Sequence, residues 1–391
     1  MRSFGRSLLL GAVLASAKHL KPSKHTCQTI LTCPEGTIFV SKTDPSAHFT
    51  TVQDAISSLP NDNSTQTILI LPGTYEEQVN VTRSGPITLL GQTDDPKDAT
   101  KNKVTLTWAQ ANHDNTGKAV DNVFSSVLTV APTLEASYTG SGTTGYPVPE
   151  DTPFGNVDFR VYNVDFTNTW REYSDGPAHA ISFSRANGGF YHCGFYSYQD
   201  TVYVGKLGNA YFYKSIIAGQ TDFLYGFGTA WIQSSEILLR NCGGGITAWK
   251  GTNTTFTNNY GVYIVDSTVK AANASIAPEI KGRCALGRPW NSLHRSVFAC
   301  TSEDASILPS GYIDWIVDGQ GRQSKETVMA EYRTFGPGYN ATGRRDGNVT
   351  RVLDDKEYTR YSSPARVFQY PDGKLGNIGW IDQSIAIPMT N

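Results

Sequence analysis

A six-residue pattern, with apolar residues at both ends and small or polar residues between them, recurs through the middle of the chain. Successive copies begin 20 to 32 residues apart, and they occupy residues 161–166, 190–195, 212–217, 232–237 and 264–269. The apolar ends are β-branched or aromatic, Gly, Asn and Ser bound the copies, and no 3.6-residue periodicity is present. This composition favours short strands over helices.

Regular recurrence at this period predicts a solenoid in which each copy belongs to one coil. In a parallel β-helix the matching positions of successive coils stack into ladders, and the longer intervals form loops. An antiparallel sandwich is the second interpretation, but it gives no reason for the same six-residue phase to return. We therefore expect an all-β, single-domain parallel β-helix over residues 36–385.

The first 17 residues have the order of a secretory signal peptide. Arg2 and Arg6 are followed by an apolar run at residues 8–14 and by a small-residue cleavage site at residues 15–17. We expect the protein to be secreted and extracellular, with residues 18–35 forming an extension before the β-helix.

Cysteines and glycosylation signals agree with an extracellular location. The six cysteines suit an oxidising compartment, and none forms a CxxC pair of the zinc or thioredoxin kind. We expect Cys27 to pair with Cys33 and, as a second guess, Cys284 with Cys300, although sequence does not fix the connectivity. N-glycosylation signals occur at Asn63, Asn80, Asn253, Asn273, Asn340 and Asn348.

Charge and motif content argue against several classes of function. The 391 residues include 33 Lys and Arg and 35 Asp and Glu, scattered along the chain, so no basic footprint for nucleic acid or anionic lipid is present. No segment after the signal is long and apolar enough to span a membrane. The chain lacks GxSxG, HExxH and clustered His and Cys ligands, so serine- and zinc-hydrolase chemistry has no support.

Two aspartates one coil apart are the candidate reactive groups. Asp200 and Asp222 are separated by 22 residues, so the solenoid stacks them on neighbouring strands about 4.7–4.9 Å apart. His179 lies 20 residues before Gln199, so we expect it one coil earlier and level with that glutamine. Adjacent carboxylates do not both ionise readily, so one keeps a proton as an acid while the other acts as nucleophile or base. Amide or imidazole N–H groups beside them could hold an oxyanion, but a purely structural polar ladder fits the spacing equally well.

Six short motifs, in the same order, resemble those of the pectin methylesterase (pectinesterase) family. They are GTYEE at residues 73–77, YQDTVY at 198–203, TDFLYG at 221–226, ITAWKG at 246–251, ALGRPW at 285–290 and EYRTFGPG at 331–338. The corresponding family patterns are GxYxE, QDT, DFIFG, ITAQGR, LGRPW and EY followed by GPG. The resemblance covers most of the chain and implies a right-handed parallel β-helix with long loops flanking a cleft. It also implies hydrolysis of the C6 methyl esters of galacturonate units in pectin, which releases methanol.

The resemblance implies a role for each matching polar residue. Asp222 matches the nucleophile that attacks the ester carbonyl. Asp200 matches the general acid that protonates methanol and then, as a base, activates water. Gln199 matches an oxyanion donor, and Arg288 matches the arginine that pairs with the nucleophile and keeps it anionic. GTYEE, far upstream of the acids, reads as a structural turn into a strand.

Three aromatic residues match positions of the family's sugar cleft. Trp290, Tyr203 and Tyr225 could cover pyranose faces with their rings. Ordinary core filling is the alternative for each of them, and for Tyr225 the two readings are nearly balanced.

One departure from the family bears on the chemistry. The segment HAISF places His179 where the family's QAVAL has glutamine. An imidazole can also donate to an oxyanion, so our hypothesis is that His179 is a working oxyanion donor with its own pH dependence. The alternative is that Gln199 and backbone groups suffice. ITAWKG also lacks the family's glutamine, with Trp249 in its place.

Other functions remain open alternatives at this point. They are a non-catalytic carbohydrate-binding β-helix, a lyase or polygalacturonase on the same scaffold, and a structural wall protein. The resemblance implies no cofactor or metal. It makes methylated pectin the expected partner, and we expect a monomer that binds neither nucleic acid nor membrane.

Overall fold

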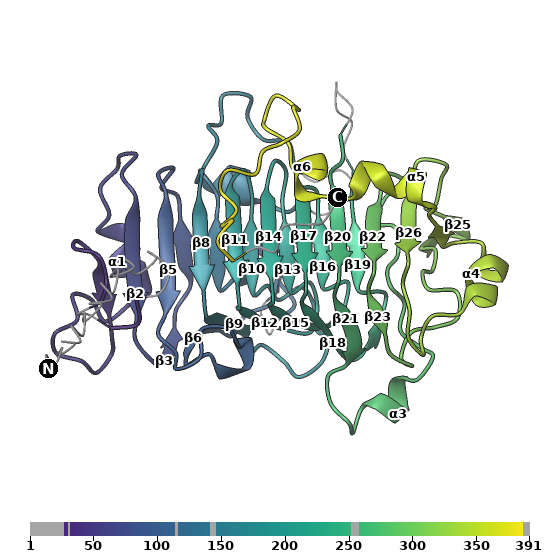
Figure 1. The fold of residues 1–391 in the computed structure, drawn as a ribbon, viewed down its shortest axis with the longest axis horizontal. Helices are drawn as coiled ribbons and strands as arrows, with labels where there is room; N and C mark the ends of the chain where they lie inside the picture. The colour runs from purple at the N-terminus through teal and green to yellow at the C-terminus, as the bar shows by residue number, and fades with distance from the viewer. Residues whose placement is uncertain (1–26, 30–31, 114–115, 141–145, 252–257, 386–391) are drawn as a thin grey trace, which may run out of the picture.

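The structure is a computed structural model that describes residues 27–29, 32–113, 116–140, 146–251 and 258–385. The expected signal peptide lies outside the described residues. Three parallel sheets run along the molecule, with successive coils side by side along its long axis (Figure 1).

The strands of each sheet follow one another in spatial order. Sheet A contains β1 (Ile38–Val40), β2 (Gln66–Ile70), β5 (Ile87–Gly91), β8 (Phe159–Tyr162), β11 (Asn187–Tyr191), β14 (Asn209–Tyr213), β17 (Thr229–Gln233), β20 (Gly261–Val265), β22 (Arg295–Ala299), β26 (Val328–Tyr332) and β27 (Arg351–Val352). Sheet B contains β3 (Gly73–Glu76), β6 (Val104–Trp108), β9 (Val164–Asn168), β12 (Gly194–Tyr196), β15 (Ile216–Thr221), β18 (Glu236–Gly243), β21 (Thr268–Ala271) and β23 (Ser302–Glu303). Sheet C contains β4 (Val79–Val81), β7 (Leu128–Val130), β10 (Ile181–Phe183), β13 (Val202–Val204), β16 (Leu224–Gly226) and β19 (Thr247–Trp249).

Short elements complete the described chain. A two-stranded antiparallel hairpin is formed by β24 (Ile316–Val317) and β25 (Gln320–Gly321). The helices are α1 (Val52–Ser57), α2 (Leu134–Ser137), α3 (Ala277–Ile280), α4 (Ala341–Gly347), α5 (Asp355–Tyr358) and α6 (Pro364–Val367), with single 3₁₀ turns η1 (Ala99–Lys101), η2 (Asn122–Ser125) and η3 (Thr359–Tyr361).

The chain visits the three sheets in a fixed order. From β11 in sheet A it enters β12 in sheet B and β13 in sheet C, and it then returns to sheet A as β14. The same order repeats through β16 and again through β19, and neighbouring coils pair in parallel. These connections confirm the predicted parallel β-helix.

The six-residue pattern stacks in register, as predicted, but each copy is not a single strand. Val161, Phe190, Phe212, Ile232 and Ile264, the first residues of the five copies, pair in sequence across sheet A. Each copy then turns a corner into sheet B, because its third residue has a left-handed backbone with φ of 48° to 55°; these residues are Asn163, His192, Lys214, Ser234 and Asp266. The polar middle of the pattern is therefore a turn.

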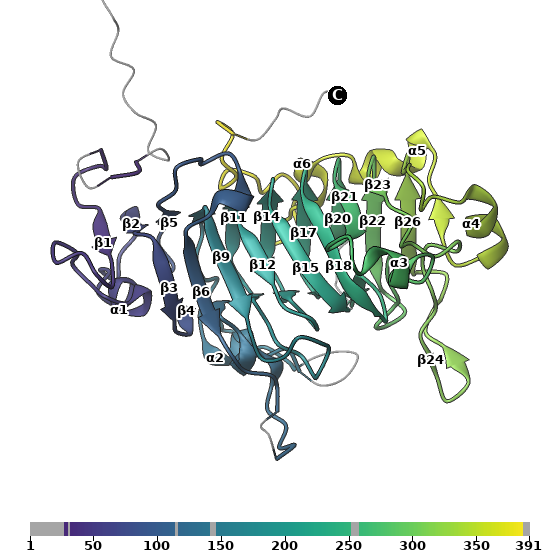
Figure 2. The ribbon, with the colours of Figure 1, turned by 90° about the horizontal axis from the view of Figure 1, so that it is seen from below.

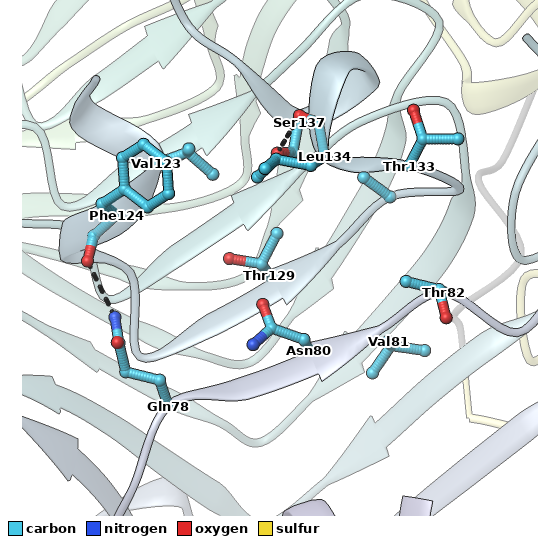
Figure 3. A pocket seen from close by; sticks show the side chains of 11 residues that line it. Gln78, Asn80, Val81, Thr82, Val123, Phe124, Thr129, Thr133, Leu134 and Ser137 are labelled. Atoms are coloured by element: carbon cyan, nitrogen blue, oxygen red, sulfur yellow. Dashed lines mark hydrogen bonds between the residues drawn. The ribbon is translucent and has the colours of Figure 1, made fainter. Parts of the chain in front are cut away.

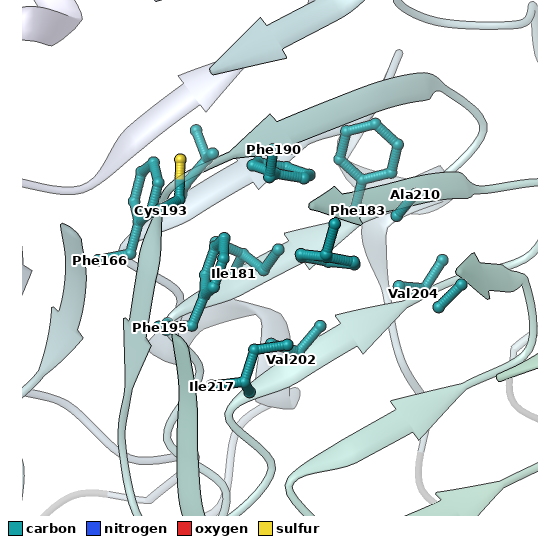
Figure 4. Packing of buried hydrophobic residues seen from close by; sticks show 14 of the residues in the cluster. Phe166, Ile181, Phe183, Phe190, Cys193, Phe195, Val202, Val204, Ala210 and Ile217 are labelled. Atoms are coloured by element: carbon teal, nitrogen blue, oxygen red, sulfur yellow. The ribbon is translucent and has the colours of Figure 1, made fainter. Parts of the chain in front are cut away.

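Alternating side chains of sheet A are buried on both faces. Phe190 points into the solenoid, where its ring stacks on Phe212 with centroids 5.0 Å apart (Figure 4). The next residue, Tyr191, lies in a second apolar cluster outside the sheet. The C-terminal segment returns along this outer face, drawn in yellow in Figure 1, and covers it with Phe368, Trp380 and other side chains.

One disulfide prediction is confirmed and the other is wrong. Cys27 is bonded to Cys33, as expected. Cys284 is bonded to Cys242, not to Cys300, whose thiol is free. Cys242 lies near the end of β18, with its Cα 4.8 Å from that of Cys284, whereas Cys300 lies at the corner between β22 and β23.

The GTYEE motif has a structural contact, in keeping with its reading as a turn. The carboxylate of Glu77 accepts hydrogen bonds from the backbone N–H groups of Val52 and Gln53, at 2.9 and 2.8 Å. These are the first residues of α1, whose N–H groups have no partner within the helix. The motif thus ties α1 to the following coil.

Two loop regions project from the same side of the solenoid, one holding α2 and the other the β24–β25 hairpin (Figure 2). Trp315, next to β24, packs against an apolar cluster on sheet C that consists of Tyr203, Tyr225, Phe227 and Ala248. Phe124 of η2, before β7, and Leu134 of α2, after β7, line a hollow with Asn80 and Thr129 of the same sheet. The loops therefore flank the outer face of sheet C.

Among the described residues, no helix has the length and apolar character needed to cross a bilayer.

Candidate active site

Asp200 and Asp222 occupy the same corner of successive coils. Gln199 pairs in parallel with Thr221, which places the following residues, the two aspartates, next to each other. Both have left-handed backbones, with φ of 59° and 49°, where the chain leaves sheet B for β13 and β16. Asp is among the residues that tolerate this conformation best. The predicted stacking is confirmed, although the aspartates lie at corners and not within strands.

Asp222 is held by an arginine fork. Arg288 donates from Nε to Oδ1 at 3.0 Å and from Nη2 to Oδ2 at 2.6 Å, and the backbone N–H of Gly245 donates to Oδ1 at 3.2 Å. Burial raises the pKa of Asp222, while the Arg288 contacts and the Gly245 N–H lower it. Three donors on one carboxylate stabilise its anionic form and fix its orientation.

Arg288 reaches Asp222 because the preceding backbone packs tightly. Gly287 bridges Thr247 in parallel, and a Cβ atom on this glycine would lie 2.0 Å from the Thr247 hydroxyl oxygen. The backbone N–H of Arg288 also donates to the Thr247 carbonyl at 2.9 Å. The glycine in ALGRPW therefore allows the close approach that sets the arginine against the acid.

The environment of Asp200, unlike that of Asp222, favours the protonated form of the carboxyl. Burial and, next, the charge of Asp222 raise the pKa of Asp200 well above its usual range, with opposition from Lys250, Arg288 and the Tyr225 hydroxyl. Only 5% of Asp200 and 3% of Asp222 is exposed. Because Asp222 has the direct arginine fork, its anionic form is the better stabilised of the two, and Asp200 is the acid that favours its protonated form. The pair can supply one protonated acid and one anionic nucleophile.

An aromatic and cationic wall lies beside the two acids. Trp290 is half-buried, and its ring meets that of Trp315 edge to face, with centroids 4.9 Å apart. The Arg288 guanidinium lies 3.6 Å from the Trp315 ring centroid, and the Lys250 ammonium lies 4.3 Å from that of Trp290. Burial lowers the pKa of Lys250 to about 8, and the charge of Asp200 opposes this shift.

Sequence reasoning missed Trp315 and Lys250. Trp315 is an isolated tryptophan outside every quoted motif, so the sequence carries no signal for it. Lys250 replaces the glycine of the family's ITAQGR motif. This replacement could have identified Lys250 from the sequence as a candidate site residue. Gln199 is partly exposed and directly precedes Asp200.

The two tyrosines predicted to contact sugar are almost completely buried. Tyr203 and Tyr225 pack with Phe227 and Ala248 in a small apolar cluster on sheet C. Tyr203 also stacks on the ring of His179, with centroids 5.9 Å apart. Of the three predicted aromatic residues, only Trp290 retains appreciable exposure.

His179 is placed differently from our expectation. Ile181 pairs with Val202, so His179 is level with Asp200, and Ala178 takes the place beside Gln199. The expected alignment with Gln199 was therefore one residue out of phase. The buried ring contacts Ser126 Oγ through Nδ1 at 3.1 Å and Tyr225 Oη through Nε2 at 2.6 Å. Burial lowers its pKa to about 3, so the imidazole is neutral.

A separate pocket of about 280 Å³ lies farther along the face of sheet C (Figure 3). Asn80 of β4 and Thr129 of β7 form its floor, and Phe124 and Leu134 lie across from them. It contains none of the predicted site residues.

Within the part of the chain that the structure describes, there is no group of three or more His, Cys, Asp or Glu side chains that could hold a metal ion.

Several solved structures with the same fold are pectin methylesterases. The enzyme from Aspergillus niger, in penultimately deglycosylated form, has a TM-score of 0.68 and 24% identity, covering 90% of this chain and 98% of that one. The carrot enzyme has a TM-score of 0.66 and 23% identity over 85% and 92% of the two chains. A pectin methylesterase in complex with hexasaccharide VII has a TM-score of 0.64 and 21% identity over 85% and 96%.

Sequence relatives extend over most of the chain. A pectinesterase from Aspergillus aculeatus is 31% identical over 344 residues, which is 87% of this chain and 90% of that protein. Pectinesterase 31 from Arabidopsis thaliana is 31% identical over 320 residues, which is 80% of this chain and 87% of that protein. The pectinesterase family model matches residues 154–368, which include both aspartates and the arginine fork. The chain belongs to the pectinesterase family.

Proposed function

We propose that this protein hydrolyses methyl esters of galacturonate units in pectin, with Asp222 as the nucleophile and Asp200 as the general acid and base. The observation that supports this assignment is the unequal acid pair. Arg288 holds Asp222 as an oriented anion, and the neighbouring buried Asp200 retains the proton. Family membership supplies the substrate class.

The reaction divides into acylation and deacylation. The Asp222 carboxylate attacks the C6 carbonyl carbon, and the Gln199 amide donates to the oxygen that gains negative charge. The bond to the methoxy oxygen breaks, and this oxygen takes the proton of Asp200 to leave as methanol. Asp200, now anionic, removes a proton from water that attacks the acyl carbon. The bond between the acyl carbon and the Asp222 oxygen then breaks, which regenerates Asp222 as an anion. The galacturonic acid that forms loses the second proton of the water to solvent, and Asp200 keeps the first.

Trp290 supplies the aromatic surface for the sugar. Its ring is partly exposed and is held in place by Trp315 and Lys250, so it can cover a pyranose face without reorganising. A related pectin methylesterase forms a complex with a hexasaccharide. We infer that methylated homogalacturonan lies over the outer face of sheet C beside this ring.

We further infer that the protein acts outside the cell as a monomer. Two features support secretion, namely the signal-like order of the first 17 residues and the two disulfides of the described chain. Light scattering of the purified protein, together with its recovery from culture medium, tests this inference.

The function is tested by measuring two products at once. Purified protein is incubated with highly methylated pectin, and released methanol and polymer length are followed together. We expect methanol to accumulate while the polymer keeps its length. Chain shortening without methanol would indicate a lyase or polygalacturonase, and binding without either change would indicate a non-catalytic carbohydrate-binding protein.

A further inference from the structure

The pocket on the face of sheet C has a polar side and an apolar side (Figure 3). Asn80, Thr82 and Thr129 supply the polar side, and Phe124 and Leu134, which are 40% and 50% exposed, lie across from it. Its volume of about 280 Å³ equals that of about nine water molecules at roughly 30 Å³ each. A pyranose has hydroxyls at its edge and apolar C–H groups on its faces, and these faces pack on aromatic rings. The pocket therefore suits a single sugar unit.

The charge and position of the pocket do not suit the reacting part of the substrate. None of the residues that line it is charged. A galacturonate unit that has lost its ester is an anion, and it would find no cationic partner there. The pocket lies at β4 and β7, and β4 is three strands from β13 in sheet C, a separation of about 14 Å at 4.7–4.9 Å per strand. A neutral sugar held apart from the two acids fits these observations best.

The chain carries an attachment point for such a sugar in the pocket itself. Asn80, Val81 and Thr82 form an N-glycosylation signal. In extended chain, residues two apart point to the same face, so Asn80 and Thr82 both lie on the pocket side while Val81 is buried. The other signals were identified from sequence alone, whereas this one coincides with a cavity.

The Asn80 backbone is fixed and its side chain is accessible. Gln53 of α1 accepts from the Asn80 backbone N–H at 2.6 Å, and Gln53 Nε2 lies 3.4 Å from the Asn80 carbonyl oxygen, to which it donates. The Asn80 side chain is exposed, and its amide makes no hydrogen bond to another residue that the structure describes. The amide nitrogen is therefore available for modification without loss of a structural contact.

We propose that Asn80 is N-glycosylated and that the first N-acetylglucosamine of its glycan occupies this pocket. Asn80 Nδ2 forms a bond to the anomeric carbon of the sugar and gives up one of its two protons. The bond between that carbon and a pyrophosphate oxygen of the lipid-linked oligosaccharide donor breaks, and the lipid pyrophosphate leaves. The inference rests on the secretion that we propose above, and it does not depend on the chemistry of the two acids.

The apolar side of the pocket is held in place before the sugar is attached. Gln78 Nε2 donates to the backbone carbonyls of Phe124 and Ser126 at 2.8 and 3.0 Å. Ser137 Oγ donates to the Leu134 carbonyl at 2.6 Å. A sugar linked to Asn80 stays next to these side chains at high effective concentration, so weak contacts are enough to hold it. The glycan then covers two exposed apolar side chains at this end of sheet C.

Mass spectrometry of peptides tests the modification. The full chain is secreted from yeast, its glycans are trimmed to the first sugar, and the peptide that contains Asn80 is analysed. We expect this peptide to carry one N-acetylglucosamine, to lose it in Asn80→Gln and Thr82→Ala, and to keep it in Thr82→Ser. An unmodified Asn80 peptide in the wild type would overturn the proposal. If Leu134→Ser then raised KM for methylated pectin, the pocket would be a substrate subsite instead.

The rate of glycan removal tests whether the sugar occupies the pocket. Peptide N-glycosidase should release the Asn80 glycan about 10-fold more slowly from the folded protein than from the denatured chain, because release requires local opening. Leu134→Ser, which weakens the apolar side, should speed release from the folded protein. Leu375→Ser is the matched control, since Leu375 is also 50% exposed but lies outside the pocket, and it should leave the rate unchanged.

Two results separate this proposal from others. Equal release from the folded and denatured wild type would overturn occupancy of the pocket, because the glycan would then extend into solvent. Methanol release is measured on the same preparations. A protein that carries the protected Asn80 glycan but releases no methanol would support the glycan site and refute the proposed function.

Discussion

At the scale of single residues, environment gives two identical side chains different tasks. Asp200 and Asp222 are both buried at corners with the same backbone conformation. Only Asp222 receives the two N–H donors of Arg288, so it carries the charge. Asp200 is left with burial and a neighbouring anion, and both favour its protonated form.

Replacing Arg288 should move the acid limb of the pH profile. Arg288 lowers the pKa of Asp222, so Arg288→Leu raises it, and a higher pH is then needed to form the nucleophilic carboxylate. We expect lower activity and an acid limb of kcat/KM displaced to higher pH. The exposed Arg283→Leu serves as control. An acid limb that stays in place in Arg288→Leu would show that the fork does not set the charge of Asp222.

At the scale of elements, each coil depends on a residue in a left-handed corner. Such a backbone costs an L-residue roughly 1–2 kcal/mol, more for β-branched side chains, and the stacked strands on either side offset this cost. The corner between β17 and β18 is Ser234, with φ of 52°. The hydrogen bond from its N–H to Val265 at 3.0 Å ties the corner to the next coil.

Substitutions at this corner should follow backbone preference. Ser234→Val is expected to destabilise the protein by about 1–2 kcal/mol, whereas Ser234→Gly should cost nothing or stabilise slightly. Urea unfolding of both variants measures the difference. Equal losses in the two would mean that the side chain, and not the backbone conformation, matters at the corner.

A buried ion cluster holds the last coils together. Arg344 of α4 contacts Glu303 and Glu331, each at 2.6 Å, with all three side chains at most 1% exposed. Glu331 begins the EYRTFGPG motif, and a Cβ on Gly336 of the same motif would lie 2.4 Å from the Glu303 carbonyl oxygen. The late family motif is therefore structural, since it closes the solenoid around this cluster.

Replacing Arg344, the cation of this cluster, should destabilise the last coils of the solenoid. Arg344→Leu leaves buried acids without their partner, a change that costs about 3–5 kcal/mol. The adjacent Arg345, largely exposed, is a matched control for which Arg345→Leu should stay within about 0.5 kcal/mol. Guanidinium unfolding curves compare the two. The idea fails if both variants unfold at the wild-type midpoint.

The sequence predicted the coils better than the side-chain contacts. The six-residue pattern and the 22-residue interval between the aspartates both reflect the length of a coil. They therefore predicted which residues of neighbouring coils pair. Coil length varies, however, which is why His179 was assigned one position away from its true neighbour. Trp315 and Asn122 reach the site from loops, and their positions depend on tertiary packing that no local pattern encodes. The disulfide between Cys242 and Cys284 was not predicted for the same reason, because tertiary packing brings the two cysteines together.

At the scale of the whole molecule, the solenoid has one aromatic face that its own C-terminus covers. Tyr191 and Trp231 lie on the outside of sheet A, and Tyr358, Phe368 and Trp380 of the returning segment pack over them. The Tyr191 hydroxyl oxygen also accepts a hydrogen bond from the backbone N–H of Asp382 at 2.7 Å. This cover lies on sheet A, whereas the acids lie at the corners between sheets B and C.

Truncation after residue 353 should therefore expose an apolar face without altering the acids. We expect a lower melting temperature and self-association, because an uncovered aromatic face of this kind is an aggregation site. Light scattering and a thermal melt measure both effects. A truncated chain that stays monodisperse and melts like the full-length protein would contradict this role of the C-terminal segment.

The most direct measurement concerns the nucleophile. Methanol release from methylated pectin is compared for the wild type and Asp222→Asn, with circular dichroism to verify that both are folded. We predict a loss of about 10³-fold or more, as expected when a covalent nucleophile is removed, with an unchanged spectrum. A folded Asp222→Asn protein that releases methanol at the wild-type rate would contradict the mechanism.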